Sequence, residues 1–127
     1  MDLLKVGSDW LQSQRAKFLT RNIVYVRDAE SVEIPATVGK TIFRVDTGYG
    51  RLERLESRDY LVTASKLILD GQVKIPEAGD CIRETDGPTV YVYEVMAPGN
   101  EPVYRYSDPY RKTLRIHTKL VSTEPAT

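Results

Sequence analysis

The sequence has one cysteine, one histidine and no long apolar run, and each shortage excludes a class of protein. Cys81 alone cannot form an internal disulfide, and one thiol with one imidazole, His117, cannot build a metal site within the chain. No apolar stretch approaches the roughly 20 residues that a membrane helix needs, and the N-terminus lacks the apolar core of a signal peptide. We therefore expect no metal, no cofactor and no membrane contact, and we expect assembly in a cytosol.

The chain also lacks an excess of charge of either sign. Eighteen Lys and Arg balance eighteen Asp and Glu among 127 residues, so the formal net charge is 0. A neutral chain is not a free polyanion binder, and any nucleic-acid contact must come from a local patch. Hydrophobic residues at 41% and charged residues at 28% are typical of a globular domain. Basic residues are in excess near both ends and acidic residues in the middle, which suits assembly of like copies.

One stretch at the start of the chain has helical periodicity. Leu4, Leu11 and Phe18 recur at a spacing that places them on one helix face, with Trp10 beside Leu11. The pattern predicts a helix over about residues 2–20. We expect these four side chains to dock the helix on the rest of the protein.

From residue 22 the apolar period changes to two, and the content of β-branched and aromatic residues rises. This predicts a mainly β fold, a small β-barrel or sandwich of about seven or eight strands with one N-terminal helix. We expect a single domain over residues 1–121, with its β part over about 22–121. Residues 122–127 have no apolar side chain except Ala126 and predict a flexible tail.

Two glycine-containing segments and one charged segment mark the expected turns. Gly39-Lys40 predicts a turn between two strands, and Gly48-Tyr49-Gly50-Arg51 predicts a loop whose glycines accept positive φ. The alternating charges of Arg51–Arg58 predict a solvated strand or arm. The loop lacks the lysine and the strand-to-helix context of a nucleotide-binding motif.

Few residues are candidates for catalysis. His117 is flanked by cations and fits a strand histidine that faces solvent or an interface, and Cys81 fits a small buried residue. Asp59 and Asp80 are a formal acid and base pair, but Arg58 next to Asp59 suggests a salt bridge instead. We therefore expect no enzyme and no catalytic residue, with a hydrolase that uses His117 and Cys81 as a minor alternative.

The last predicted strand has one basic face and one apolar face. Its odd positions are Arg111, Thr113, Arg115, His117 and Lys119, and its even positions include Leu114, Ile116 and Leu120. Arg105 lies in the neighbouring predicted strand. A basic row of this kind is an ordinary solvated face, a surface that touches DNA phosphates, or a surface that pairs with acidic residues of another subunit.

Several segments together resemble a known family. They are Trp10-Leu11, Ser57-Arg58-Asp59-Tyr60-Leu61-Val62, the turn Ile75–Ile82, Tyr104–Asp108 and Leu114–Lys119. Over nearly the whole of residues 3–120 the sequence is similar to the tailed-bacteriophage head-tail joining proteins, also called head closure or stopper proteins.

The resemblance implies a structural protein of the virion neck with no catalytic residues. Its subunits are expected to form a homo-oligomeric ring, sixfold or twelvefold, that joins the portal or adaptor to the tail protein or tail terminator and helps retain packaged DNA. The glycine loop of residues 48–51 is the candidate channel loop. A neck adaptor or tail-completion subunit remains an alternative, as does a small β-barrel nucleic-acid-binding module that uses Arg105, Arg111, Arg115, His117 and Lys119.

Overall fold

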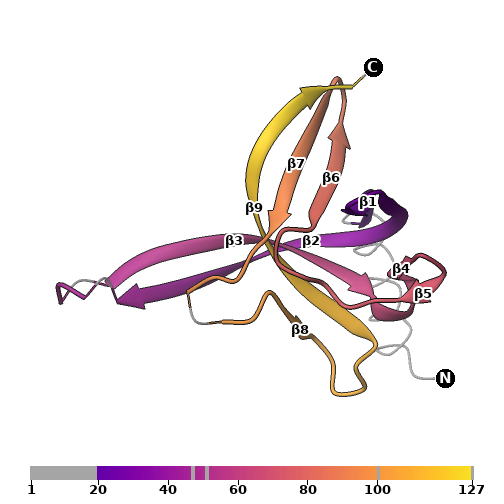
Figure 1. Ribbon diagram of the computed structural model, residues 1–127. Helices are drawn as coiled ribbons and strands as arrows, with labels where there is room; N and C mark the ends of the chain where they lie inside the picture. Colours follow the sequence, from indigo (N-terminus) through magenta and orange to yellow (C-terminus); the bar gives the residue numbers. More distant parts are fainter. Residues whose placement is uncertain (1–19, 47, 51, 100, 127) are drawn as a thin grey trace, which may run out of the picture.

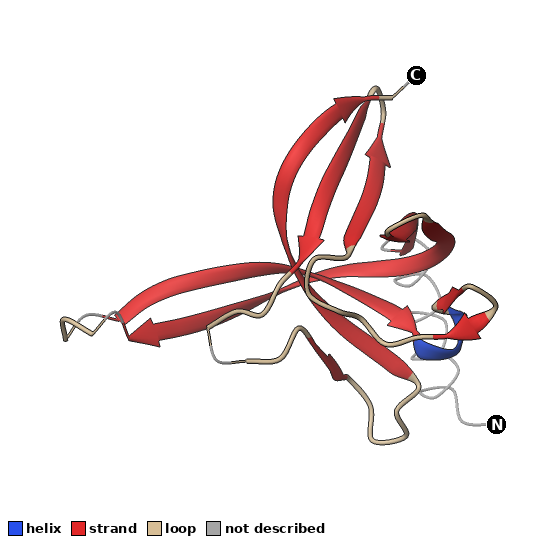
Figure 2. Ribbon diagram, in the orientation of Figure 1, coloured by secondary structure: helices blue, strands red, loops and turns tan. Residues whose placement is uncertain are grey.

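The computed structural model describes residues 20–46, 48–50, 52–99 and 101–126. The predicted helix over about 2–20, with its docking residues Leu4, Trp10, Leu11 and Phe18, lies outside the described residues except for Thr20, which opens the first strand. The described residues are mostly strand (Figure 2), which confirms the mainly β fold class.

The strands are β1 (Thr20–Arg27), β2 (Glu30–Asp46), β3 (Leu52–Thr63), β4 (Ile68–Leu69), β5 (Gln72–Val73), β6 (Cys81–Asp86), β7 (Thr89–Val95), β8 (Tyr104–Tyr106) and β9 (Thr113–Pro125). A short 3₁₀ helix, η1 (Ala64–Lys66), follows β3. It fits the single helical turn for which residues 64–69 leave room before the Asp70-Gly71 turn.

The main sheet has seven antiparallel strands in the order β3-β2-β1-β6-β7-β9-β8, and β9 also pairs with β3. The pairings β3-β2-β1-β6-β7-β9 therefore return to their first strand and form a closed circuit. Closure removes most of the unpaired edges that an open sheet exposes. The remaining strands, β4 and β5, form a separate two-stranded sheet.

The core lies inside this circuit. Apolar side chains at alternate positions of its strands are at most 2% exposed, namely Ile23, Tyr25, Ile34, Ala36, Tyr60, Val62, Ile82, Val95, Leu114 and Ile116. Full burial of one Val, Leu or Ile side chain stabilises a fold by about 1.5–3 kcal/mol. The alternation that predicts the strands is thus the same alternation that fills the core.

The strand β2 runs for 17 residues without the turn predicted at Gly39-Lys40. Both residues stay in the ladder because β3 pairs with them, Gly39 with Asp59 and Lys40 with Arg58. Beyond these pairs the two strands continue as a projecting two-stranded arm (Figure 1), which ends at the pair Asp46 and Leu52. We call residues 39–57 the arm. The strand or arm predicted over Arg51–Arg58 is confirmed as a strand from Leu52, but it is not solvated throughout, because Ser57 is 1% exposed.

The strand β9 corrects the predicted tail, because it continues to Pro125. It pairs with β3 over residues 113–118, with β8 over 114–116 and with β7 over 118–125. With β6 and β7, its second half forms a three-stranded finger (Figure 1). Residues 122–125 are held by backbone pairing rather than by burial, so their lack of apolar side chains does not prevent a strand.

The finger contains a register shift, and its position corrects a second prediction. Tyr93 pairs with Leu120 but Val92 pairs with Ser122, so Val121 is an extra residue in β9. A bulge of this kind bends a strand and redirects its side chains. Leu120, predicted to face the core with Leu114 and Ile116, is 52% exposed because it lies before this bulge where β9 has already left β3 at Thr118 and entered the finger.

Candidate functional site

The basic face predicted for β9 is not an open row of cations, because two of its members bind a buried carboxylate. Asp59 on β3 is 0% exposed, and Arg115 Nε lies 2.7 Å from its Oδ2 while His117 Nδ1 lies 2.9 Å from its Oδ1. The hydroxyls of Ser57 (2.6 Å) and Thr41 also donate to this carboxylate. His117 is itself 3% exposed, so the sequence interpretation of a histidine facing solvent or an interface does not hold within the single chain.

Opposing effects act on the pKa of Asp59. Burial raises it, but the hydrogen bonds from His117, Ser57, Thr41 and Arg115 together outweigh burial and hold the pKa below its usual value. The carboxylate therefore stays charged at neutral pH and ties β2, β3 and β9 together at the root of the arm.

A second buried carboxylate, Glu84 on β6, bridges the opposite side of the circuit. It is 3% exposed and accepts from Arg58 Nη2 at 2.8 Å, from Tyr60 Oη at 3.0 Å and from Arg21 Nη1 at 3.3 Å. Burial and the nearby Glu84 charge raise the pKa of Tyr60, although Arg58 opposes this. Arg58 therefore forms an ion pair with Glu84 and not with the adjacent Asp59.

A third carboxylate, Asp80, anchors the turn that leads into β6. Arg27 Nη2 lies 2.7 Å from Oδ2, the Tyr25 hydroxyl donates to the same atom, and the Glu77 backbone N–H donates at 3.0 Å. Burial and the bond to Asp80 raise the pKa of Tyr25, so the phenol remains protonated. Asp59 and Asp80 belong to separate clusters, and the acid and base pair considered from sequence does not form.

The other members of the predicted basic set lie apart. Arg105 is exposed on β8 and pairs in register with Arg115. Arg111 has a φ of 57° in the turn before β9, and its guanidinium lies 5.8 Å from the centre of the Tyr106 ring. Lys119 is exposed where β9 enters the finger. The structure thus brings together Arg115 and His117 but gathers no single surface from all five residues.

The candidate channel loop lies at the tip of the arm. Gly48 and Gly50 have φ of 85° and 73°, values that favour glycine, and Tyr49 between them is 90% exposed. Arg51 lies outside the described residues. The loop is thus separated from the closed circuit by the length of the arm (Figure 1), and its role in a channel stays a prediction.

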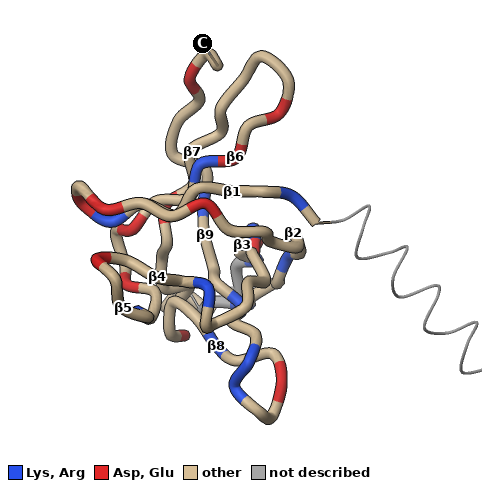
Figure 3. Tube along the Cα trace, turned by 90° about the vertical axis from the view of Figure 1, so that its right-hand side faces the viewer, with Lys and Arg blue, Asp and Glu red and all other residues tan. Residues whose placement is uncertain are grey.

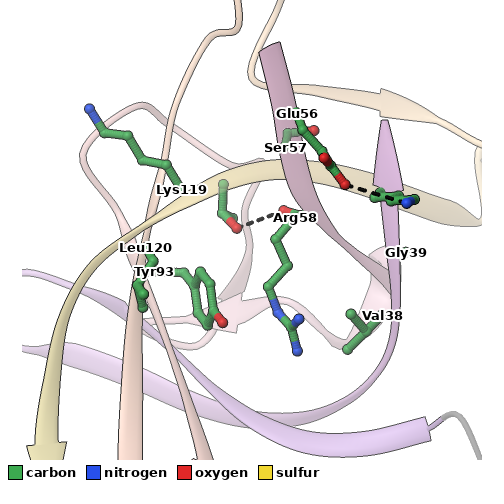
Figure 4. A pocket seen from close by; sticks show the side chains of 10 residues that line it. Val38, Gly39, Glu56, Ser57, Arg58, Tyr93, Lys119 and Leu120 are labelled. Carbon is green, nitrogen blue, oxygen red and sulfur yellow. Dashed lines mark hydrogen bonds and ion pairs between the residues drawn. The ribbon is translucent and has the colours of Figure 1, made fainter. Parts of the chain in front are cut away.

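A pocket of about 660 Å³ opens between the root of the arm and the finger. Arg58 and Tyr93 lie in it (Figure 4), with the Arg58 guanidinium carbon 5.0 Å from the centre of the Tyr93 ring. The rim carries the Lys40–Glu56 ion pair at 3.5 Å, and Lys119 borders the opposite side. The pocket exists because β3 and β9 pair as far as Arg58 and Thr118 and then diverge.

The cluster of Ser57, Asp59 and His117 has the residue types of a catalytic triad but not its geometry. A triad histidine holds the acid on one ring nitrogen and the nucleophile on the other. Here Nδ1 of His117 faces both, at 2.9 Å from Asp59 and 3.4 Å from Ser57 Oγ, and the serine donates to the aspartate. All three side chains are nearly inaccessible, with exposures of 0–3%. The arrangement stabilises the strands and presents no nucleophile to solvent.

Neither the thiol nor a metal group offers other chemistry. Cys81 is partly buried, and burial together with the charges of Glu94 and Asp80 raises its pKa, which opposes formation of a reactive thiolate. Among the described residues no group of three or more His, Cys, Asp or Glu is placed to hold a metal ion. No helix in this part of the chain is long and apolar enough to cross a membrane.

A comparison with family models decides the family. The model described as phage head-tail joining protein matches residues 1–125, nearly the entire chain. The chain belongs to this family. The searches of curated proteins and of solved structures found no match to this head-tail joining protein. The suspected family is therefore confirmed, and with it a role as a structural protein of the phage virion at the neck between head and tail.

Sequence reasoning missed the three buried carboxylates that organise this head-tail joining fold. Asp59 and Asp80 were considered for catalysis, and Glu84 was not singled out. A usable signal exists at Asp59, since an acid next to the aromatic and apolar run Tyr60-Leu61-Val62 of a strand needs a partner if it is buried. Its partners Arg115 and His117 lie more than 50 positions along the chain, a separation that no local pattern encodes.

Proposed function

We propose that this protein is a ring-forming head-tail connector, the head closure or stopper subunit that joins the portal or its adaptor to the tail. The observation that carries the proposal is the family match over residues 1–125. Copies would assemble in the host cytoplasm into a sixfold or twelvefold ring in the virion neck, where the ring helps to retain packaged DNA.

The geometry supports a structural part rather than a catalyst. The closed circuit of strands is what a small β-barrel body requires, and three buried carboxylates tie its strands together. An arm and a finger project from this body (Figure 1) and present surface that the subunit itself does not cover. Bodies with projecting elements suit contacts between copies and with the proteins above and below.

The nucleic-acid-binding module is less well supported. Two of its five predicted residues, Arg115 and His117, are bound to Asp59 inside the fold. A phosphate contact depends on cations that are open to the ligand. In the ring, DNA would instead meet loops that face the channel, with the residues 48–51 loop as our candidate.

Assembly of particles lacking this protein tests the proposal. Phage produced with the gene disabled should yield DNA-filled heads and separate tails, and the intact protein supplied in trans should restore joined particles. Cryo-electron microscopy of restored particles should place its density as a ring between portal and tail. Joined, infectious particles without the protein would refute the proposal, and density elsewhere in the neck would favour the adaptor or tail-completion alternative.

A further inference from the structure

The arm is a two-stranded ribbon that lacks a third strand. The pairing of β1 with β2 ends at Thr37, and the pairing of β9 with β3 ends at Arg58. Beyond these residues β2 and β3 pair only with each other within the described chain. An isolated two-stranded ribbon is marginally stable in water, and its open edges readily pair with another chain. The arm therefore has the form of an element that another molecule covers.

Two arginines face each other across this ribbon. Arg44 and Arg54 are directly paired, both are exposed, and neither has a hydrogen-bond or ion-pair partner among the described residues. Like charges placed directly opposite destabilise a strand pair. Two adjacent guanidiniums present several N–H donors in a fixed geometry that matches carboxylates. A carboxylate-bearing partner would relieve the repulsion and use these donors.

The apolar neighbours of the arginines favour a protein partner. Ile42 shares their face and is 45% exposed, and Leu55 on the other face is 40% exposed. Arginine beside exposed aliphatic side chains is the composition of a protein interface. A surface for phosphates alone does not need the aliphatic side chains.

The chain carries an acidic surface of its own at the turn between β1 and β2. Asp28 and Glu30 lie at the turn, and Glu33 lies three residues along β2 on its other face; all three are exposed, and within the described residues none of them has an ion-pair partner. The adjacent cation, Arg27, is bound to Asp80. Acidic residues mark this turn in Figure 3. The turn therefore presents exposed carboxylates without a described ion-pair partner, as the arm presents the guanidiniums of Arg44 and Arg54.

We propose that the arm of one copy lies on the β1–β2 turn of a second copy, where Arg44 and Arg54 bind its carboxylates. The arm and the turn lie on opposite sides of the molecule (Figure 1), so one copy cannot satisfy its own arm. Each copy gives one arm and accepts another. Such a head-to-tail contact repeats from copy to copy and closes into a ring when the rotation permits.

This inference rests on the proposed ring function and adds the surfaces that build the ring. The proposed contact uses the paired strands of the arm, and the tip at residues 48–50 lies beyond the contact. It also predicts that self-association weakens with salt, because exposed charges are screened.

Reciprocal charge reversal tests the contact in the full-length protein. Arg44→Glu with Arg54→Glu reverses the arm, and Glu30→Lys with Glu33→Lys reverses the turn; Asp28 is left unchanged because its φ of 53° disfavours most other residues. By analytical ultracentrifugation and native mass spectrometry, each pair alone should weaken self-association about tenfold or more. A chain carrying all four changes should recover most of the loss, and a mixture of the two pairs should assemble in alternation.

The control reverses two exposed lysines elsewhere, Lys66→Glu with Lys112→Glu, which changes the net charge by the same amount as the arm variant. It should assemble as the unaltered protein does. Unchanged assembly of the reversed arm would overturn the inference, and so would failure of the fourfold variant to recover while its circular dichroism shows a folded chain. Duplex DNA binding that the arm reversal abolishes without affecting assembly would identify DNA as the occupant and also overturn it.

The failure of this inference and the failure of the proposed function are distinguishable. Complementation of particles that lack the protein measures whether the protein joins heads to tails. The charge reversals measure whether copies associate through the arm and the turn. If the arm variant joins heads to tails as well as the unaltered protein does, the contact is refuted and the function stands. If the unaltered protein does not restore joining, the proposed function fails whatever the ultracentrifuge shows.

Discussion

At the scale of single residues, Asp59 accepts hydrogen bonds from four side chains of the described part of the chain. Its carboxylate is fully buried and is hydrogen-bonded by the side chains of Arg115, His117, Ser57 and Thr41. A buried charge costs free energy unless it is paired, and removal of one partner leaves the others unpaired. Asp59 is thus expected to be worth far more to stability than any surface ion pair.

Substitution of Asp59 measures this difference. Asp59→Ala should lower the free energy of unfolding by about 3–5 kcal/mol, because it leaves the buried His117, Ser57 and the half-buried Arg115 without their shared acceptor. Urea unfolding followed by circular dichroism gives the value. Glu77→Ala, whose long ion pair to Arg27 is mostly solvated, is the control and should change it by about 0–1 kcal/mol. Similar values for the two variants would contradict a structural role for the Asp59 cluster.

The same carboxylate gives stability a dependence on acid pH. Because the pKa of Asp59 is lower in the folded chain than in the unfolded one, its contribution is complete above the unfolded pKa of about 4 and decreases as pH falls below it. Denaturation at a series of pH values should show the free energy of unfolding falling from about pH 4 towards pH 2. The fall should be shallower in Asp59→Asn, and an equal slope in both proteins would count against the shifted pKa.

Arg115 and His117 show what the residue pattern can and cannot predict. Alternation along β9 correctly separates them from the buried Leu114 and Ile116. It does not say what the odd face meets, because that depends on β3 pairing with β9 in a register that brings Asp59 opposite His117. The sequence therefore predicted the charge of this face and not its burial.

At the scale of elements, the second half of β9 is held by its neighbour rather than by a core. Residues 122–125 are exposed, yet they pair with Val92, Tyr91, Val90 and Thr89 of β7. The expectation of a flexible tail rested on the absence of apolar side chains. Backbone pairing with β7 does not require them, and this is why composition could not predict the strand.

Truncation tests the element. Deletion of residues 122–127 should lower the free energy of unfolding by about 1–3 kcal/mol, since each lost backbone hydrogen bond contributes about 0.5–1.5 kcal/mol net. Thermal and urea unfolding measure the loss. Glu124→Gln removes only the ion pair with Arg83 and should have a much smaller effect. A truncated chain as stable as the full one would restore the description of a tail.

The arm should be the least protected paired element. Its two strands lack a third strand, and most of their described side chains are exposed or half-buried, so its amides open more easily than those of the closed circuit. Hydrogen exchange of the dilute protein, read by mass spectrometry, should show faster exchange in residues 39–46 and 52–57 than in β1 and β6. Equal protection would mean that the arm is covered within a single copy.

At the scale of the whole molecule, the closed circuit joins residues that are far apart in sequence. The Thr118 hydroxyl donates to the Arg58 carbonyl across 60 positions, where β3 meets β9. Local propensity predicted most of the strands, but it could not predict this closure, which depends on the registers of six strands together. The loop-closure entropy of such pairings slows folding.

Refolding kinetics test this. Stopped-flow dilution from urea should give a main phase on the millisecond-to-second scale that is typical of all-β domains with distant pairings. His117→Ala removes one Asp59 contact and should mainly speed unfolding if this cluster forms late. A main phase in microseconds would show that the circuit closes through local contacts.

The position of β9 in the chain has a further consequence for how the protein is made in the cell. Residues 113–125 leave the ribosome after every strand with which they pair. The circuit therefore cannot close until β9 pairs with both β3 and β7. Until then the growing chain holds β3 and β7 with an open side each, at synthesis rates of about 5–20 residues per second. Nascent chains stalled before residue 113 should therefore recruit chaperones, and full chains extended by a C-terminal linker that lets residues 113–125 leave the ribosome should not.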